Sequence, residues 1–139
     1  MKFRYQKIPF RGHDPQKPFI ARPFIPVYLH GKIKKAESPY YALLDSGADN
    51  ILFPSDLAQE IGIDAITNGK LELVMGIAGQ KAEVYFHTAA LEIVGDSRKL
   101  PVIVGFSDVI FIPILGRSFF RHFKSVIFDE SKEEVELKN

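Results

Sequence analysis

A short polar segment interrupts an otherwise apolar pattern in the middle of the chain. The strand-like run Tyr40–Leu44 precedes it, and the apolar pattern resumes at Ile51. The residues between them are Asp45, Ser46, Gly47, Ala48, Asp49 and Asn50. A carboxylate between two core-forming strands costs free energy unless it is hydrogen-bonded or takes part in chemistry. The segment is therefore either an Asx-type turn between strands or a functional loop centred on Asp45.

The rest of the chain predicts a small all-β protein. Its 139 residues suit one domain, and 46% of them are hydrophobic, enough for a real core. Many short apolar runs are separated by turn signals, and few segments suit a helix. We therefore expect an all-β sandwich or closed barrel in residues 23–139. Residues 1–22 are basic and proline-rich, and they predict an extended arm that is either docked on the domain or poorly ordered.

Composition excludes several classes of function. The chain has no cysteine, which excludes disulfides and thiolate catalysis and favours an intracellular, cytoplasmic location. No run approaches transmembrane length and the first seven residues lack the apolar core of a signal peptide, so we expect no membrane partner. We expect no metal and no cofactor, because the histidines lack a ligand spacing. The histidines are His13, His30, His87 and His122.

Charge gives no reason to expect a nucleic-acid partner. The formal net charge is +1, so the chain has no strong overall field. The basic side chains of the arm are balanced by an acidic tail, which favours a solvated terminus. These basic residues are Lys2, Arg4, Lys7, Arg11, Lys17 and Arg22.

Two short helices and a terminal hairpin are expected from local signals. Ser55 suits a helix N-cap, and Gly62 suits the end of the same helix. Residues 117–123 suit a second short helix with its phenylalanines turned inward. Residues 125–128 and 133–137 predict a terminal hairpin.

The centre of the chain predicts a long hairpin followed by two strands. Apolar alternation through residues 71–93 predicts the hairpin, whose tip is bounded by Gly76 and Gly79. Residues 100–104 and 110–115 predict strands, the second ending at Gly116.

Three segments, in this order, resemble the retropepsins, the dimeric aspartic proteases of retroviruses and their cellular relatives. They are the Asp45-Ser46-Gly47 loop, the hairpin tip at residues 75–79 and the sequence Ile114-Leu115-Gly116-Arg117. The tip is similar to the flap that closes over substrate, and the last segment to the apolar-apolar-Gly-Arg signature of the family. The resemblance spans residues 24–126. It implies a cellular single-domain member with a retropepsin-like closed barrel, one or two short helices and a flap hairpin.

The resemblance also implies a role for each matched residue. Asp45 resembles the catalytic aspartate, and Ser46 and Gly47 resemble the residues that support the active-site loop. Asp49 resembles a substrate-binding carboxylate, and we expect it to form a partly buried pair with Arg117. The other substrate-binding residues would be Ala48, Met75, Gly76, Ile77, Ala78 and Gly79.

The implied activity is that of an aspartic endopeptidase acting on an extended apolar peptide. This chemistry needs two carboxylates that share one proton, and the chain contains one Asp-Ser-Gly sequence. We therefore expect a homodimer in which each copy supplies Asp45. Residues 133–137 are the first candidate for additional strand pairing between subunits, and residues 24–28 the second.

Two other functions remain open at this point. The first is a catalytically silent retropepsin-fold module for protein or peptide binding or assembly, since a fold does not determine a function. The second is an unrelated small β-barrel that binds a ligand, with Asp45 in an exposed turn.

Overall fold

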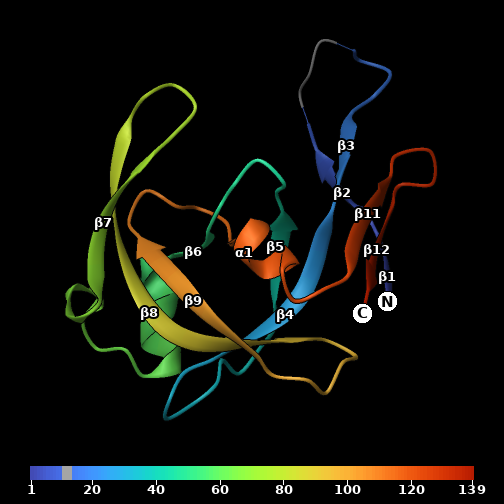
Figure 1. Ribbon diagram of the computed structural model, residues 1–139. Helices are drawn as coiled ribbons and strands as arrows, with labels where there is room; N and C mark the ends of the chain where they lie inside the picture. The colour runs from blue at the N-terminus through green and yellow to red at the C-terminus, as the bar shows by residue number, and fades with distance from the viewer. Residues whose placement is uncertain (11–13) are drawn as a thin grey trace.

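The chain folds around one closed β-barrel, in a computed structural model that describes residues 1–10 and 14–139 (Figure 1). Arg11 of the basic arm and His13 lie outside the described residues. The strands of the main sheet are β4 (Phe24–His30), β5 (Tyr40–Leu44), β6 (Ile51–Pro54), β7 (Lys70–Met75), β8 (Lys81–Ile93), β9 (Leu100–Ser107) and β10 (Ile114–Leu115). Their order is β4-β5-β10-β6-β9-β8-β7, and a further pairing of β4 with β8 closes the barrel, with β7 outside it. The expected all-β fold is confirmed.

Alternating apolar side chains fill the barrel. On β4, Ile25, Val27 and Leu29 are fully buried, and the residues between them are less so. The rings of Phe53 and Phe106 meet inside the barrel with centroids 6.4 Å apart. Each such side chain contributes about 1.5–3 kcal/mol by leaving water.

The shortest strand, β10, occupies the centre of the sheet. It pairs in parallel with β5 and antiparallel with β6. Residues 110–115 were expected to form one strand, but only Ile114–Leu115 does so. Pro113 has no N–H to donate to a neighbouring strand, and Phe111 lies on the surface with 90% of its area exposed.

Short helices connect the strands. They are the 3₁₀ helices η1 (Ser55–Ile61) and η2 (Ile66–Asn68) and the α-helix α1 (Arg117–Phe120). The predicted N-cap at Ser55 is wrong by one residue, because Pro54 takes the cap position and the Ser55 hydroxyl donates to the carboxylate of Asp108. Gly62 ends η1 as expected, with φ +85°. No helix in the described part of the chain is long and apolar enough to cross a membrane.

Both chain ends meet in a second sheet. Its strands are β1 (Lys2–Arg4), β11 (Ser125–Asp129) and β12 (Glu134–Lys138), in the order β1-β12-β11. Because β12 is paired along both edges, the expectation that residues 133–137 pair with another subunit is wrong. The second choice, residues 24–28, stays a prediction: residues 24–27 pair with β5 and residues 27–30 with β8, so only Val27 is paired on both sides.

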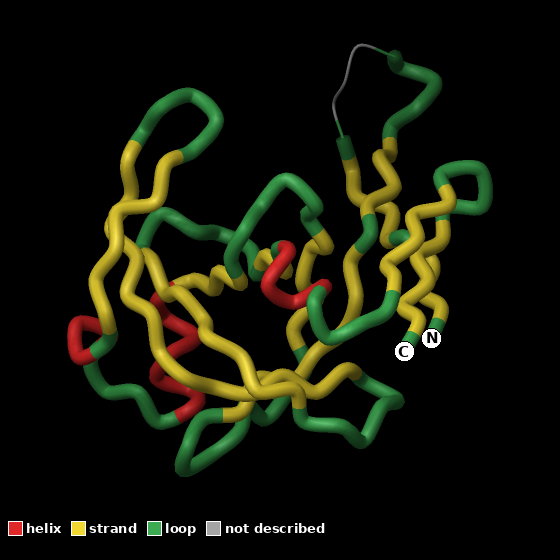
Figure 2. Tube along the Cα trace, viewed as in Figure 1, coloured by secondary structure: helices red, strands yellow, loops and turns green. Residues whose placement is uncertain are grey.

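The N-terminal arm contains strands of its own. Residues 2–4 are docked as β1, and the hydroxyl of the buried Tyr5 donates to Glu130 at 2.8 Å. A hairpin of β2 (Gln6–Pro9) and β3 (Phe19–Arg22) follows, and Figure 2 shows it beside the hairpin of β11 and β12.

Candidate active site

The loop that carries Asp45 rests on the segment that follows β10. This arrangement arises because β10 lies between the strands that enter and leave the loop, β5 and β6. Backbone N–H groups bind the two segments together, so the loop has one defined position. These hydrogen bonds run from Asp45 to the carbonyl of Leu115 (3.1 Å), from Gly116 to Asn50 (3.1 Å), from Arg117 to Ala48 (2.8 Å) and from Ser118 to Asp49 (3.0 Å).

The carboxylate of Asp45 is itself held in place. The N–H of Gly47 donates to its Oδ1 at 2.9 Å, and the N–H of Ala48 donates to the Asp45 carbonyl at 3.2 Å. The loop is thus an Asx turn, and the same turn orients a half-buried carboxylate. A Cβ at Gly47 would lie 3.2 Å from that oxygen, which is tight for a larger residue.

Asp45 opens onto a cleft of about 370 Å³ beneath the tip of the hairpin of β7 and β8. Figure 1 shows this hairpin extending well beyond the barrel. Both the Asp45 loop and the hairpin tip, which the sequence predicts as functional segments, line this cleft, although they are about 30 residues apart in the chain. The expected residues that line it are Asp45, Gly47, Ala48, Asp49, Met75, Gly76 and Ile77.

Other expected residues lie beside the cleft. Ser46 is exposed at the end of the loop, and Ala78 and Gly79 are exposed at the hairpin tip. The cleft also has walls that the sequence analysis missed. Alternation along β7 and β8 could have indicated Val74, Ala82 and Val84, whereas nothing local indicated the segment after β9. The missed residues are Asn50, Leu52, Val74, Gln80, Ala82, Val84, Val109 and Ile110.

The hairpin above the cleft carries large apolar side chains in water. Ile77 is fully exposed, and Leu73 and Met75 expose more than 60% of their area. Apolar side chains gathered in this way indicate a surface that binds another molecule.

Asp49 and Arg117 approach each other, but in solvent. The Nη1 atom of Arg117 lies 3.9 Å from Oδ1 of Asp49, and the two side chains are 66% and 85% exposed, respectively. The expected pair is therefore present, but the expectation that it is partly buried is wrong for the single chain. An exposed pair of this kind adds about 0–1 kcal/mol.

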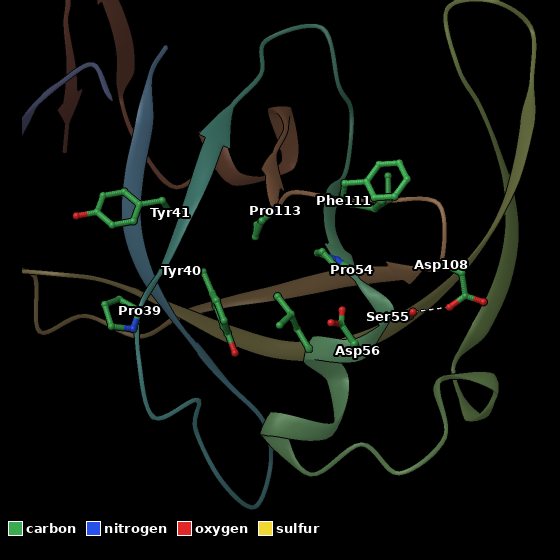
Figure 3. A pocket seen from close by; sticks show the side chains of 11 residues that line it. Pro39, Tyr40, Tyr41, Pro54, Ser55, Asp56, Asp108, Phe111 and Pro113 are labelled. Carbon is green, nitrogen blue, oxygen red and sulfur yellow. Dashed lines mark hydrogen bonds between the residues drawn. The ribbon is translucent and has the colours of Figure 1, made fainter. Parts of the chain in front are cut away.

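A larger cavity of about 590 Å³ is lined by residues of β5, of η1 and of the segment 108–113 (Figure 3). Its carboxylates belong to Asp56 and Asp108, and the second is bound by the Ser55 hydroxyl. Burial raises the pKa of Tyr40, whose hydroxyl donates to Glu60. Neither the Asp45 loop nor the exposed hairpin lines this cavity, so the smaller cleft is the better candidate for an active site.

The described residues contain no group of three or more His, Cys, Asp or Glu side chains that could hold a metal ion.

Solved structures share this fold. The chain is similar to the EIAV protease complexed with the inhibitor HBY-793, with a TM-score of 0.55 and 20% identity, over 80% of this chain and 92% of that one. It is also similar to a retropepsin-like aspartic protease from Rickettsia conorii, with a TM-score of 0.58 and 17% identity, over 97% of this chain and 88% of that one. Identities this low show the fold alone, and the expected retropepsin-like fold is confirmed.

Sequence comparison defines the family. The family model described as aspartyl protease matches residues 25–119, which include the Asp45 loop, the hairpin and Gly116. Because the match covers more than half of the chain, this protein belongs to the aspartyl protease family. No curated protein matches the chain.

Proposed function

We propose that this protein is an aspartic endopeptidase that works as a homodimer, in which Asp45 of each copy forms the catalytic pair. The observation that carries the proposal is the cleft. In it, the N–H of Gly47 donates to the carboxylate of Asp45 at 2.9 Å, beneath a hairpin whose apolar side chains are exposed. Membership of the aspartyl protease family supports peptide hydrolysis as the class of reaction.

One chain supplies half of the required pair. The other carboxylate in the cleft, Asp49, lies on the exposed side of the loop with Arg117 3.9 Å away. It is poorly placed to share a proton with Asp45. The second carboxylate therefore comes from Asp45 of another copy, which a two-fold axis beside the loop would bring within reach.

In the proposed reaction the pair carries one proton. The ionised carboxylate takes a proton from a water molecule as the water oxygen attacks the scissile carbonyl carbon. The protonated carboxyl of the other copy donates its proton to the carbonyl oxygen, which gives a gem-diol. The amide nitrogen then takes a proton from the first carboxyl, the C–N bond breaks, and a diol hydroxyl returns a proton to the other carboxylate. The products are an amine and a carboxylic acid, and the pair again carries one proton.

The walls of the cleft favour an extended apolar peptide. Leu52, Val74 and Val84 line it with apolar surface, and Ile77 can cover a bound chain from above. We assign the tip at residues 75–79 as a flap that closes over substrate. The exposed Ser46 would contact the loop of the second copy, and the Gly47 carbonyl would accept from the bound peptide.

The proposal is tested by digesting a peptide library at pH 4–7 with the wild type and with Asp45→Asn. We expect the wild type to cleave in the presence of a chelator and Asp45→Asn to lose roughly 10²- to 10⁴-fold in turnover, because it cannot ionise. Asp49→Asn is the matched control in the same cleft, and we expect its main effect on KM. Equal melting temperatures would show that each variant folds.

Two outcomes would contradict the proposal. A wild type that cleaves nothing over this pH range would favour a silent peptide-binding module. Cleavage by Asp45→Asn at the wild-type rate would show that another group does the chemistry.

A further inference from the structure

The sheet that joins the chain ends has an open edge at β11. Among the described residues, β11 pairs with β12 on one side only. An open edge presents N–H and C=O groups that pair readily with another strand, and proteins usually protect it with lysine or proline. The sequence of β11, Ser-Val-Ile-Phe-Asp, contains neither, and its central residue Ile127 is 41% exposed.

This edge is connected closely to the active site. The chain leaves α1 and runs directly into β11 (Figure 1). The N–H of Ser118 in α1 donates to the carbonyl of Asp49 at 3.0 Å, and the ring of Phe120 packs against Phe128 of β11 with centroids 6.2 Å apart. An element that fixes β11 therefore also fixes the position of the Asp45 loop.

The sequence around β11 is complementary to itself. When two identical strands pair antiparallel about a two-fold axis, one residue must lie opposite its own copy. With Ile127 at the axis, apolar residues meet apolar ones and opposite charges meet each other. The resulting pairs are Val126 with Phe128 of the second copy, Ser125 with Asp129, and Lys124 with Glu130.

Other pairings are poorer. An axis at Phe128 would place Ile127 opposite Asp129 of the second copy, and an axis at Val126 would place Lys124 opposite Phe128. The other open edge of the sheet, β1, is three residues long, and self-pairing about Phe3 would place Lys2 opposite Arg4. Like charges directly opposite each other are destabilising.

We propose that β11 pairs antiparallel with β11 of a second copy, with Ile127 on the two-fold axis. The result is one continuous six-stranded sheet in the order β1-β12-β11-β11-β12-β1, in which each copy keeps its own termini. This interface rests on the proposed function, because it supplies the second copy on which the catalytic pair depends. It holds the two Asp45 loops together through α1 of each subunit.

The absence of cysteine from the chain makes a direct test possible. Ile127→Cys introduces a single thiol, and at the axis the two copies would lie within the Cα separation that a disulfide spans. We expect mild oxidation to give a covalent dimer that a reductant reverses. Ile103→Cys is the matched control, because Ile103 is also exposed in a strand but lies on the barrel. It should give no covalent dimer under the same conditions.

A second variant tests the same axis without forming a covalent bond. Ile127→Lys places two ammonium groups opposite each other and should raise the dimer dissociation constant roughly tenfold or more in sedimentation. Ile103→Lys should leave the constant unchanged. If circular dichroism shows that Ile127→Lys does not fold, the interface is tested by comparing Ile127→Cys with Ile103→Cys.

The interface and the proposed activity can fail separately. A covalent dimer of Ile127→Cys that cleaves no peptide would support the interface and contradict the protease function. A wild type that is monomeric at hundreds of micromolar, or a dimer that neither Ile127 variant affects, would overturn the interface whether or not peptide is cleaved.

Discussion

The two walls of the cleft are held in opposite ways. The loop that carries Asp45 is bound by backbone hydrogen bonds to residues 115–118, a segment about 70 residues farther along the chain. Within the described residues, the backbone hydrogen bonds of the hairpin tip are those of its own turn, in which the N–H of Gly76 donates to the carbonyl of Gln80 at 2.8 Å and the N–H of Gly79 donates to that of Gly76 at 3.0 Å. We therefore expect the carboxylate to hold its position before a ligand binds and the tip to adapt to the ligand.

Glycines serve different purposes in the two regions. A Cβ at Gly116 would lie 2.4 Å from the carbonyl oxygen of Asn50 and 2.5 Å from that of Ala48, both backbone atoms that cannot move away. At the tip, the three atoms nearest to a Cβ at Gly76 all belong to the flexible side chain of Gln80. Gly116 therefore permits close packing of two backbone segments, whereas Gly76 lies beside a side chain that can move aside.

The largest effect is expected from Gly116→Ala. The added methyl group would push the Asp45 loop off its support, and we expect a loss of about 3 kcal/mol in the free energy of unfolding. Gly95→Ala is the control, since Gly95 has φ +91° but open space around it, and it should lose about 1–2 kcal/mol from backbone strain alone. Urea unfolding measures the free energy of unfolding of both variants. Equal losses would show that close packing at Gly116 does not stabilise the Asp45 loop.

A smaller and more selective effect is expected at the tip. Gly76→Val should lower peptide turnover roughly tenfold, because it stiffens the backbone of the flap, with a change of about 2 °C or less in melting temperature. Ala78→Val is the control: it places the same valine side chain at the tip without replacing a glycine, so it shows the effect of side-chain size on turnover apart from the effect of a stiffer backbone. Equal protection from hydrogen exchange at the tip and in residues 100–104 would contradict a mobile flap.

The smallest effect is expected for the ion pair at the edge of the cleft. A double-mutant cycle with Asp49→Asn and Arg117→Gln should give a coupling below about 0.5 kcal/mol in the free energy of unfolding, because both side chains are exposed. The cycle is measured at a protein concentration where the chain is monomeric, because the exposure of the pair is that of the single chain. A coupling above about 2 kcal/mol would mean that the pair is buried after all.

The sequence predicted those parts of the site that are formed by short continuous segments of the chain. The Asp45 loop, the glycine-bounded tip and the sequence before Arg117 could each be found because local backbone geometry requires particular residues there. The sequence could not predict that Val109 and Ile110 line the cleft. They reach it only because the chain after β9 passes the cleft on its way to β10, which lies between β5 and β6.

The same limit explains the errors in the fold. Alternation of Val135 and Leu137 correctly indicated a strand, but the pattern cannot say which neighbours that strand has, and β1 and β11 occupy both edges. At Ser55 the hydroxyl has a distant partner, Asp108, so a local capping rule placed it wrongly.

In the proposed homodimer each chain holds half of the active site. The most direct measurement is peptidase activity per chain over a dilution series, with sedimentation at each concentration and with excess Asp45→Asn added in a parallel series. We expect activity per chain to fall as the dimer dissociates, and we expect the variant to suppress the wild type by forming mixed dimers. A sedimenting monomer that cleaves peptide at a rate per chain independent of concentration would contradict it.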